Sequence, residues 1–160
     1  MENPIFESER IKFTRVSEAL APEYLKMIND RETQRLIDLP PITATLEDEI
    51  NWAKDHLKND NPIFSMIEKA TGDFIGNIEL KKVENGVGDI GICITMNKRD
   101  NHFGQEALKT FIDYIIEKYN LEGLELTVLD FNDRAKHCYE KLGFVEESKN
   151  GNKIHMIYNK

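Results

Sequence analysis

The feature that most constrains the fold is a series of three strand-like segments between residues 62 and 96. Apolar residues recur in each segment, and turn-forming residues separate the segments. The segments cover 62–68, 74–83 and 89–96, and the turns are Thr71-Gly72-Asp73 and Glu84-Asn85-Gly86. An Asn-Gly pair between two such runs is a strong hairpin signal. The spacing therefore predicts an antiparallel meander of three strands.

After this meander the apolar residues recur at a spacing of 3.6 residues, which predicts a long helix over about 104–119. Its apolar positions are Ala107, Leu108, Phe111, Ile112, Ile115 and Tyr119. Residues 124–129 then predict a strand. A short helix is expected to end at Gly143, because glycine is favoured just beyond a helix. Two final strands, 144–147 and 154–158, flank a second hairpin signal at Asn150-Gly151.

The first sixty residues predict one strand and two helices. Residues 11–16 alternate as in a half-buried strand, and residues 20–28 carry apolar side chains at helical spacing, with Pro22 tolerated near the start. Thr45 and Asp48 form a variant of the capping box ahead of the second helix. Its expected apolar face is Leu46, Ile50, Ala53 and Leu57, with Trp52 beside it. The predicted order, β-α-α-β-β-β-α-β-α-β-β, indicates an α+β fold with a mixed, mostly antiparallel sheet, in a single domain over 1–160.

Composition narrows the possible partners and compartment. The chain of 160 residues has a formal net charge of −8, whereas nucleic-acid binders need a basic face, so neither DNA nor RNA is an expected partner. The two cysteines, Cys93 and Cys138, are far apart and lack a CxxC pair or clustered histidines, which argues against a metal site. The amino terminus lacks a secretory pattern and no apolar run is long enough to cross a membrane, so we expect a cytoplasmic protein.

The strand-to-helix junction at 96–107 is the first candidate for binding chemistry. The start of a helix presents unpaired backbone N–H groups and the positive end of the helix dipole, which together bind phosphate. Gly104 would let a phosphate approach the backbone closely, and Arg99 could add a fixed positive charge. An ordinary turn with a surface arginine fits the same pattern.

The segment 132–144 is the second candidate. Asn132 follows a strand and is a good N-cap for the short helix, although its amide could instead hold a ligand. Tyr139 lies four residues after Ala135 on the same helix face, and its phenol, with a pKa of about 10, could protonate a leaving thiolate. The alternative for Tyr139 is a half-buried packing residue. Cys138 is expected to pack in the core, because no base that would activate its thiol is evident.

Together these two segments resemble the GNAT superfamily of N-acetyltransferases. The family's R/Q-x-x-G-x-G/A loop corresponds to residues 99–104, and its N-x-x-A-x-x-x-Y-x-K-x-G-F block is matched at every fixed position. The matching residues are Asn132, Ala135, Tyr139, Lys141, Gly143 and Phe144. Residues 74–78 resemble the third strand of the RimJ/RimL-like branch, which acetylates protein amino termini and related amines. His102 stands where the family usually has glycine, and its Cβ narrows the room for a pyrophosphate.

The resemblance implies that acetyl-CoA, the co-substrate, lies in a V between two splayed central strands, with helices on both faces of the sheet. The pantetheine arm would be held by backbone groups of Ile94, Thr95 and Met96. The pyrophosphate would be held by Arg99 and by the N–H groups of His102, Phe103, Gly104 and Gln105. Asn132 and Ala135 would contact the coenzyme, and Tyr139 would protonate the departing thiolate.

The implied reaction is direct attack of a neutral amine on the thioester, without an acyl-enzyme and without a metal. Some base must take the proton of the amine. Glu79 and Asp89, both on central strands, are the candidate bases, and either could as easily be a solvated strand residue.

By the resemblance, the acceptor site is built mainly from the early helices and the late hairpin, and we expect Asp30, Glu32, Asp38 and the helix over 45–60 to shape it. A peptide or ribosomal-protein amino terminus ranks first because of the branch resemblance, and a polyamine, an aminoglycoside or another small amine stays open. The alternative functions are a non-catalytic acyl-CoA sensor module and a plain α+β interaction domain that binds no coenzyme. Both a monomer and a homodimer are compatible with the sequence.

Overall fold

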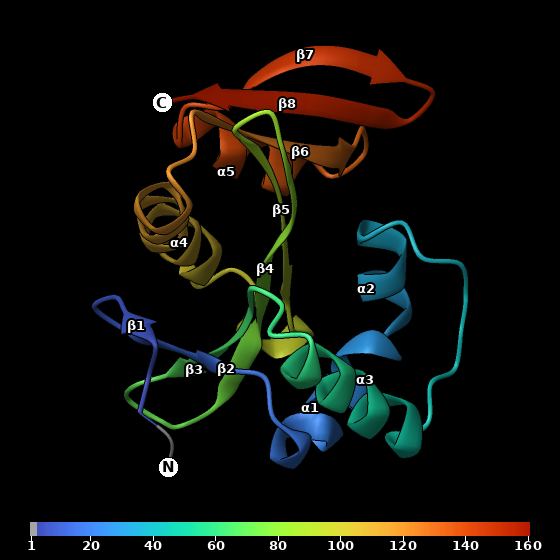
Figure 1. The fold of residues 1–160 in the computed structure, drawn as a ribbon. Coiled ribbons are helices and arrows are strands. Elements are labelled where there is room, and N and C mark those ends of the chain that lie inside the picture. Colours follow the sequence, from blue (N-terminus) through green and yellow to red (C-terminus); the bar gives the residue numbers. More distant parts are fainter. Residues whose placement is uncertain (1–2) are drawn as a thin grey trace.

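In the computed structural model, which describes residues 3–160, a sheet of eight strands forms the centre of the molecule (Figure 1). The strands are β1 (Phe6–Glu7), β2 (Ile11–Arg15), β3 (Ile63–Glu68), β4 (Phe74–Glu84), β5 (Val87–Ile94), β6 (Gly123–Leu129), β7 (Val145–Asn150) and β8 (Lys153–Asn159). They lie in the order β1-β2-β3-β4-β5-β6-β8-β7, and every neighbouring pair is antiparallel except β5 and β6. The mixed, mostly antiparallel sheet and the meander β3-β4-β5 are confirmed. Residues 1 and 2, part of the segment in which we predict no secretory signal, lie outside the described residues.

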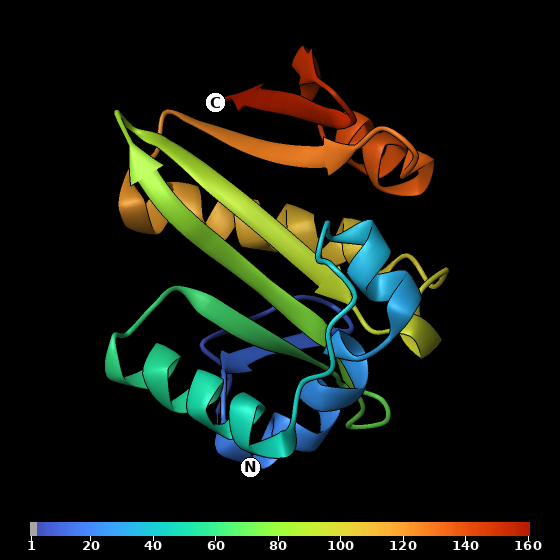
Figure 2. The same ribbon diagram turned by 90° about the vertical axis from the view of Figure 1, so that its right-hand side faces the viewer.

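Helices cover both faces of this sheet, which confirms the second part of the predicted architecture (Figures 1 and 2). They are α1 (Ala21–Ile28), α2 (Arg31–Leu36), α3 (Leu46–Lys58), α4 (Phe103–Tyr119) and α5 (Asp133–Lys141), with short 3-10 helices at Glu18–Leu20 and Met96–Lys98. On one face, α4 and α5 contribute Phe111, Ile115 and Tyr139 to the larger buried core. On the opposite face, Tyr24 of α1 and Ala53 of α3 pack in a smaller core.

Several local details differ from the prediction, and strand β1 was not predicted. The six-residue helix α2 was not predicted because it has no apolar repeat, and Thr33 and Gln34 are its buried residues. The predicted capping box of α3 is confirmed, but Glu49 takes a buried place in this helix while Leu46, in its first turn, is 44% exposed. The strand predicted over 89–96 runs over Val87–Ile94 instead, because the chain turns into a 3-10 helix at Met96.

Strands β5 and β6 pair over three residues and then part. Val87 to Asp89 pair with Gly123 to Glu125, and beyond these positions the two strands are no longer paired. Each strand keeps its outer neighbour, because β5 stays paired with β4 and β6 with β8. A β-bulge at Lys81 of β4 lies level with the last β5–β6 pair, and bulges increase the local twist of a strand. The predicted splayed centre is therefore confirmed, and Figure 2 shows the two strands diverging.

Candidate active site

A cleft of about 1420 Å³ opens where β5 and β6 part. Helices α1 to α3 contribute to one side of it, and the first turns of α4 and most of α5 contribute to the other. The predicted coenzyme residues that line it are Ile94, Met96, Arg99, His102, Phe103, Gly104, Gln105, Asn132 and Ala135. Of the predicted catalytic residues, Tyr139 and Glu79 line the cleft. Thr95 and Asp89 are not among its lining residues.

The backbone of β5 presents unpaired groups to this cleft. Hydrogen-bonding groups alternate sides along a strand, and the N–H of Thr95 donates to the carbonyl of Ile75 in β4 at 2.8 Å. The amides of Ile92 and Ile94 therefore point the other way, toward the place that β6 has left. In agreement, the carbonyl of Ile94 accepts from Arg99 Nε at 3.2 Å. An extended ligand with amide groups would find free strand-edge partners here.

The start of α4 has no cap of its own. His102 precedes the helix in the left-handed conformation, with φ of 61°, and its side chain makes no capping hydrogen bond. The first bond within the helix joins Glu106 N–H to the carbonyl of His102 at 3.3 Å, so the N–H groups of residues 103–105 have no helical partner. A Cβ placed on Gly104 would meet no atom within 4 Å. These three amides, which we call the α4 mouth, form an open anion site at the cleft.

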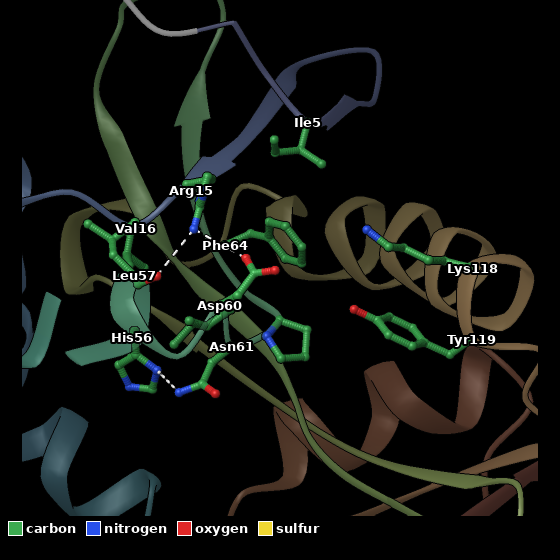
Figure 3. Close-up of a pocket in the computed structure, with 12 residues that line it drawn as sticks. Ile5, Arg15, Val16, His56, Leu57, Asp60, Asn61, Phe64, Lys118 and Tyr119 are labelled. Carbon is green, nitrogen blue, oxygen red and sulfur yellow. Dashed lines mark hydrogen bonds and ion pairs between the residues drawn. The ribbon is translucent and has the colours of Figure 1, made fainter. Parts of the chain in front are cut away.

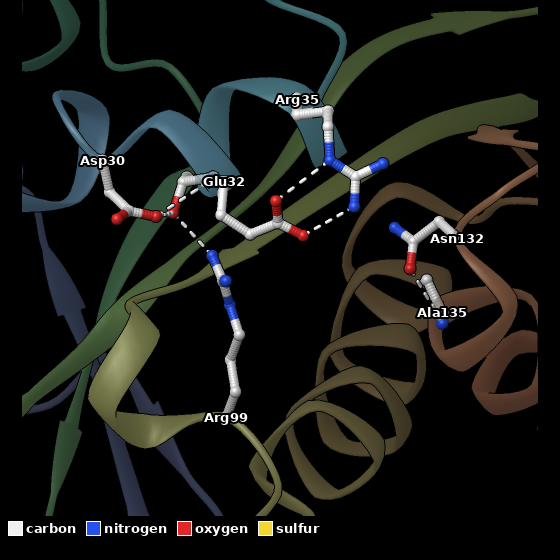
Figure 4. Close-up of polar contacts among 7 residues, drawn as sticks. Asp30, Glu32, Arg35, Arg99, Asn132 and Ala135 are labelled. Carbon is white, nitrogen blue, oxygen red and sulfur yellow. Dashed lines mark hydrogen bonds and ion pairs between the residues drawn. The ribbon is translucent and has the colours of Figure 1, made fainter.

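Arg99 extends from the loop before α4 toward α2 (Figure 4). Its guanidinium donates to the carbonyl of Ile94 and to Thr33 Oγ1, and the Thr33 hydroxyl donates in turn to Asp30 at 2.8 Å. The side chain is therefore fixed beside the cleft between β5 and α2.

The segment of α2 and the residues after it also reaches the opposite side of the cleft. Arg35 lies over the ring of Phe131 with 4.6 Å to the ring centroid, and Asp38 pairs with Lys153 at 3.3 Å. Together with the bond between Thr33 and Arg99, these contacts make α2 a bridge between the two parted halves of the sheet.

Asn132 caps α5 and lines the cleft at the same time. Its Oδ1 accepts from the N–H of Ala135 at 3.3 Å, which is the predicted N-cap bond (Figure 4). The side-chain nitrogen takes no part in this bond. Capping and ligand contact are therefore compatible at Asn132.

Tyr139 is 9% exposed and packs against Phe144, with 6.0 Å between the ring centroids. Burial raises the pKa of its phenol, so the group is protonated at neutral pH. No hydrogen bond joins its hydroxyl to any of residues 3–160. The ring of Tyr139 therefore packs as a largely buried residue, while its hydroxyl group is a free hydrogen-bond donor in the wall of the cleft.

The two candidate bases lie in different places. Burial raises the pKa of Glu79, the charges of Lys81 and His56 oppose the shift, and the residue lines the cleft. Burial also raises the pKa of Asp89, but this residue lies opposite Glu125, where β5 and β6 are still paired. Glu79 is therefore the candidate base that has access to the cleft.

The free strand edge, the α4 mouth and a buried phenol donor fit a thioester coenzyme with an extended arm and a diphosphate. In agreement, the sequence model of the acetyltransferase (GNAT) domain family matches residues 10–145 of this chain. The chain belongs to the GNAT acetyltransferase family. It is an acetyl-CoA-dependent N-acetyltransferase, and no comparison supports the alternative of a non-catalytic sensor.

Individual relatives agree with this family. An uncharacterized N-acetyltransferase, p20, of Bacillus licheniformis is 26% identical over 129 residues, which cover 74% of this chain and 70% of that protein. A GNAT acetyltransferase of Bacillus anthracis has a TM-score of 0.83 at 17% identity, covering 96% of both chains. Spermidine N-acetyltransferase of Vibrio cholerae, solved with CoA and spermine, has a TM-score of 0.81 at 20% identity, covering 95% of this chain and 96% of that one. At these identities the structures establish the shared fold.

Neither cysteine of this acetyltransferase is suited to carry an acyl group. Burial raises the pKa of Cys93 to about 12, and burial also raises the pKa of Cys138, so both thiols are protonated at neutral pH. Within residues 3–160, no group of His, Cys, Asp or Glu side chains is arranged to hold a metal ion. In the same range, no helix is both long and apolar enough to cross a membrane.

Many residues that line the acetyltransferase cleft were missed as site residues, although the helix over 45–60 was expected to border the acceptor. Among them are Tyr24, Glu49, Trp52 and Asn77. One signal was available, since Glu49 precedes Ala53 by four residues and so lies on the face of α3 that carries a core residue. For Tyr24 and Asn77 no local pattern indicates that two separate elements meet at one cleft.

A second cavity, of about 140 Å³, lies near the ends of α3 and α4 (Figure 3). Inside it Arg15 pairs with Asp60 at 3.2 Å, and Asn61 contacts His56 at 2.9 Å. The cavity is too small for the coenzyme and these polar groups satisfy one another. We therefore assign the chemistry of the acetyltransferase to the larger cleft.

Proposed function

We propose that this chain, as a single domain, transfers the acetyl group directly to a primary amine, with Tyr139 as general acid and Glu79 as general base. The observation that carries the proposal is that a protonated phenol and a carboxyl group of raised pKa line the same cleft. Perturbed groups that face one cleft are candidates for acid and base roles. Asp89 is the less favoured base, because it lies where the strands are still paired.

Acetyl-CoA would supply an activated acetyl thioester in this cleft. We assign the pantetheine arm to the backbone of residues 94–96, where the amide of Ile94 is free and that of Thr95 already pairs with β4. The pyrophosphate is assigned to the α4 mouth, with His102 beside it and Arg99 within reach after exchanging its bond to Thr33. Asn132 and Ala135 would contact the coenzyme from the opposite wall.

Two side chains and solvent balance the protons of the proposed reaction. The ammonium group of the acceptor loses one proton to Glu79, directly or through a water molecule, and Glu79 passes this proton to solvent. The neutral amine then attacks the thioester carbonyl, and its nitrogen loses a second proton to Glu79 as the tetrahedral intermediate collapses. Tyr139 gives one proton to the sulfur as the carbon–sulfur bond breaks, and exchange with solvent restores both groups. A free N–H of β5, such as that of Ile94, would stabilise negative charge on the carbonyl oxygen.

For the acceptor we propose an amine that is cationic before it reacts. A RimJ/RimL-like role on a peptide or ribosomal-protein amino terminus has support from the fold of a Vibrio cholerae protein proposed to be a ribosomal-protein-serine acetyltransferase, at 16% identity and a TM-score of 0.80. A polyamine acceptor has support from the spermidine N-acetyltransferase of similar fold. The acidic side chains Glu32, Asp38, Glu49 and Glu79 line the cleft and would attract either kind of cation.

Release of free thiol from acetyl-CoA, measured over a panel of peptides, polyamines, aminoglycosides and simple amines, tests this function. Tyr139→Phe is expected to lower kcat about 100-fold or more while leaving the dissociation constant of CoA almost unchanged. Failure of every amine in the panel to release thiol would overturn the proposal. Unchanged turnover of the Tyr139→Phe variant would remove the phenol from the acid role.

A further inference from the structure

Glu49 of α3 is a buried carboxylate without a partner of its own. The residue is 8% exposed and lines the cleft. Burial raises its pKa, the charge of Asp48 adds to the shift, and no group of residues 3–160 forms a hydrogen bond or ion pair with it. Its oxygens are reachable from the cleft, because no fully enclosed side-chain oxygen or nitrogen of the described residues lacks a partner. A desolvated carboxylate of this kind is energetically unfavourable unless a ligand supplies a hydrogen-bond donor or a positive charge.

The other acidic side chains on this side of the cleft already have cationic neighbours. Glu32 pairs with Arg35 at 2.7 Å, and Asp38 pairs with Lys153 at 3.3 Å. Glu79 lies within the electrostatic reach of Lys81. Glu49 therefore differs from its neighbours in lacking a cation.

Two aromatic side chains line the cleft together with Glu49. The rings of Tyr24 and Trp52 lie 5.2 Å apart in an edge-to-face arrangement, and both residues line the cleft. Hydrogen bonds fix this wall, since Tyr24 Oη accepts from the N–H of Ser17 at 3.1 Å and lies 2.6 Å from Ser65 Oγ, which donates to Asn77 at 2.9 Å. A carboxylate beside aromatic faces on a rigid wall is suited to an ammonium group.

The position of Glu49 separates it from the proposed base. Glu49, Trp52 and His56 recur along one face of α3, where seven residues rise about 10 Å. Glu49 lies at the end near Tyr24, whose pKa it helps to raise, whereas His56 lies at the end near Glu79. The two carboxylates thus lie toward opposite ends of a wall that contains Trp52.

We infer that Glu49, Trp52 and Tyr24 form a subsite for a second ammonium group of the acceptor, so that the preferred substrates are linear diamines or polyamines. This inference rests on the proposed transfer to an amine at Glu79. The amine beside Glu79 reacts, and the distal ammonium binds Glu49. A peptide whose only cation is its amino terminus would leave the subsite empty.

The test compares α,ω-diamines of increasing length with n-alkylamines of the same length, in wild type, Glu49→Gln and Glu47→Gln. Glu47 is the matched control, because it lies in the same first turn of α3 but is exposed and outside the cleft. Wild type is expected to prefer the best diamine at least tenfold in kcat/KM. Glu49→Gln is expected to reduce this preference about tenfold or more, mainly through KM, because one charge-assisted contact is lost. Glu47→Gln should keep the preference.

Calorimetric titration of the best diamine into each CoA-bound protein gives a readout that does not depend on turnover. Weaker binding to Glu49→Gln alone supports the subsite. Equal affinities for wild type and Glu49→Gln, or equal kcat/KM for diamines and monoamines, would overturn the subsite while leaving the proposed transfer intact. If none of the amines causes thiol release, the proposed function is wrong, and the titration would still decide whether the subsite binds a diamine.

Discussion

Replacing Gly104 with alanine is expected to separate the stability of the fold from coenzyme binding. Gly104 is the second residue of α4, and a Cβ there would meet no protein atom within 4 Å. Glycine in a helix is about 0.5–1 kcal/mol less favourable than alanine, so Gly104→Ala should raise the free energy of unfolding by about this amount. For a chain of 160 residues, this corresponds to a rise in melting temperature of about 1–4 °C.

The same methyl group would stand in the α4 mouth, where the proposed pyrophosphate approaches the backbone N–H groups. Loss of one charge-assisted hydrogen bond costs about 1.5–3 kcal/mol, so the dissociation constant of CoA should rise about 10- to 150-fold. Isothermal titration with CoA measures the affinity, and thermal unfolding without ligand measures the stability. Lys109→Ala is the control, because Lys109 is exposed on α4 outside the cleft and its loss should leave the affinity unchanged. A Gly104→Ala protein that is more stable and binds CoA as tightly as wild type would refute the proposed pyrophosphate site.

Three further predictions concern single side chains. His102→Gly should raise the free energy of unfolding, because a side chain in the left-handed conformation costs about 1–2 kcal/mol. The loss of the Cβ also widens the room for the pyrophosphate, so CoA should bind more tightly in calorimetry, and weaker binding would show that the imidazole contacts the ligand. Glu106 accepts from Ser8 Oγ at 2.6 Å and from Arg10 N–H and Nε at 2.8 and 2.7 Å, and these bonds lower its pKa although burial opposes them. Glu106→Gln should therefore cost about 2 kcal/mol of unfolding free energy at pH 7. This contribution is present above the ordinary carboxyl pKa and is lost as the pH falls through the lowered value, so a difference in melting temperature that persists in acid would contradict the assignment. Because burial raises the pKa of Glu79, its contribution to stability is full below the ordinary carboxyl pKa and is lost as the pH rises through the raised value. The value of kcat/KM should increase with pH over the same window, because the base ionises there. Glu79→Gln should abolish this increase, and an unchanged increase in the variant would show that another group is the base.

The sequence by itself determined the class of the fold and most of its elements, because the signals for them are local. At the hairpin between β4 and β5, Asn85 and Gly86 have φ values of 53° and 80°, which asparagine and glycine tolerate better than other residues. The segment around Tyr139 was likewise readable, because the helical repeat places Tyr139 and Ala135 on one face and the Asn132 cap marks where the helix begins. Confirmation of the N-cap bond shows that such short-range geometry follows from neighbouring residues alone.

Tertiary structure decided which side chains share the cleft. In the sequence, Glu79 and Asp89 are both carboxylates on predicted central strands and cannot be told apart as bases. In the structure, Glu79 lines the cleft that forms where β5 and β6 separate, whereas Asp89 lies where these two strands are still paired. The burial of Glu49 likewise depends on how α3 packs over the sheet and α1. The physical reason is that periodicity states which face of an element is apolar, whereas the partner of that face is set by contacts between segments far apart in the chain.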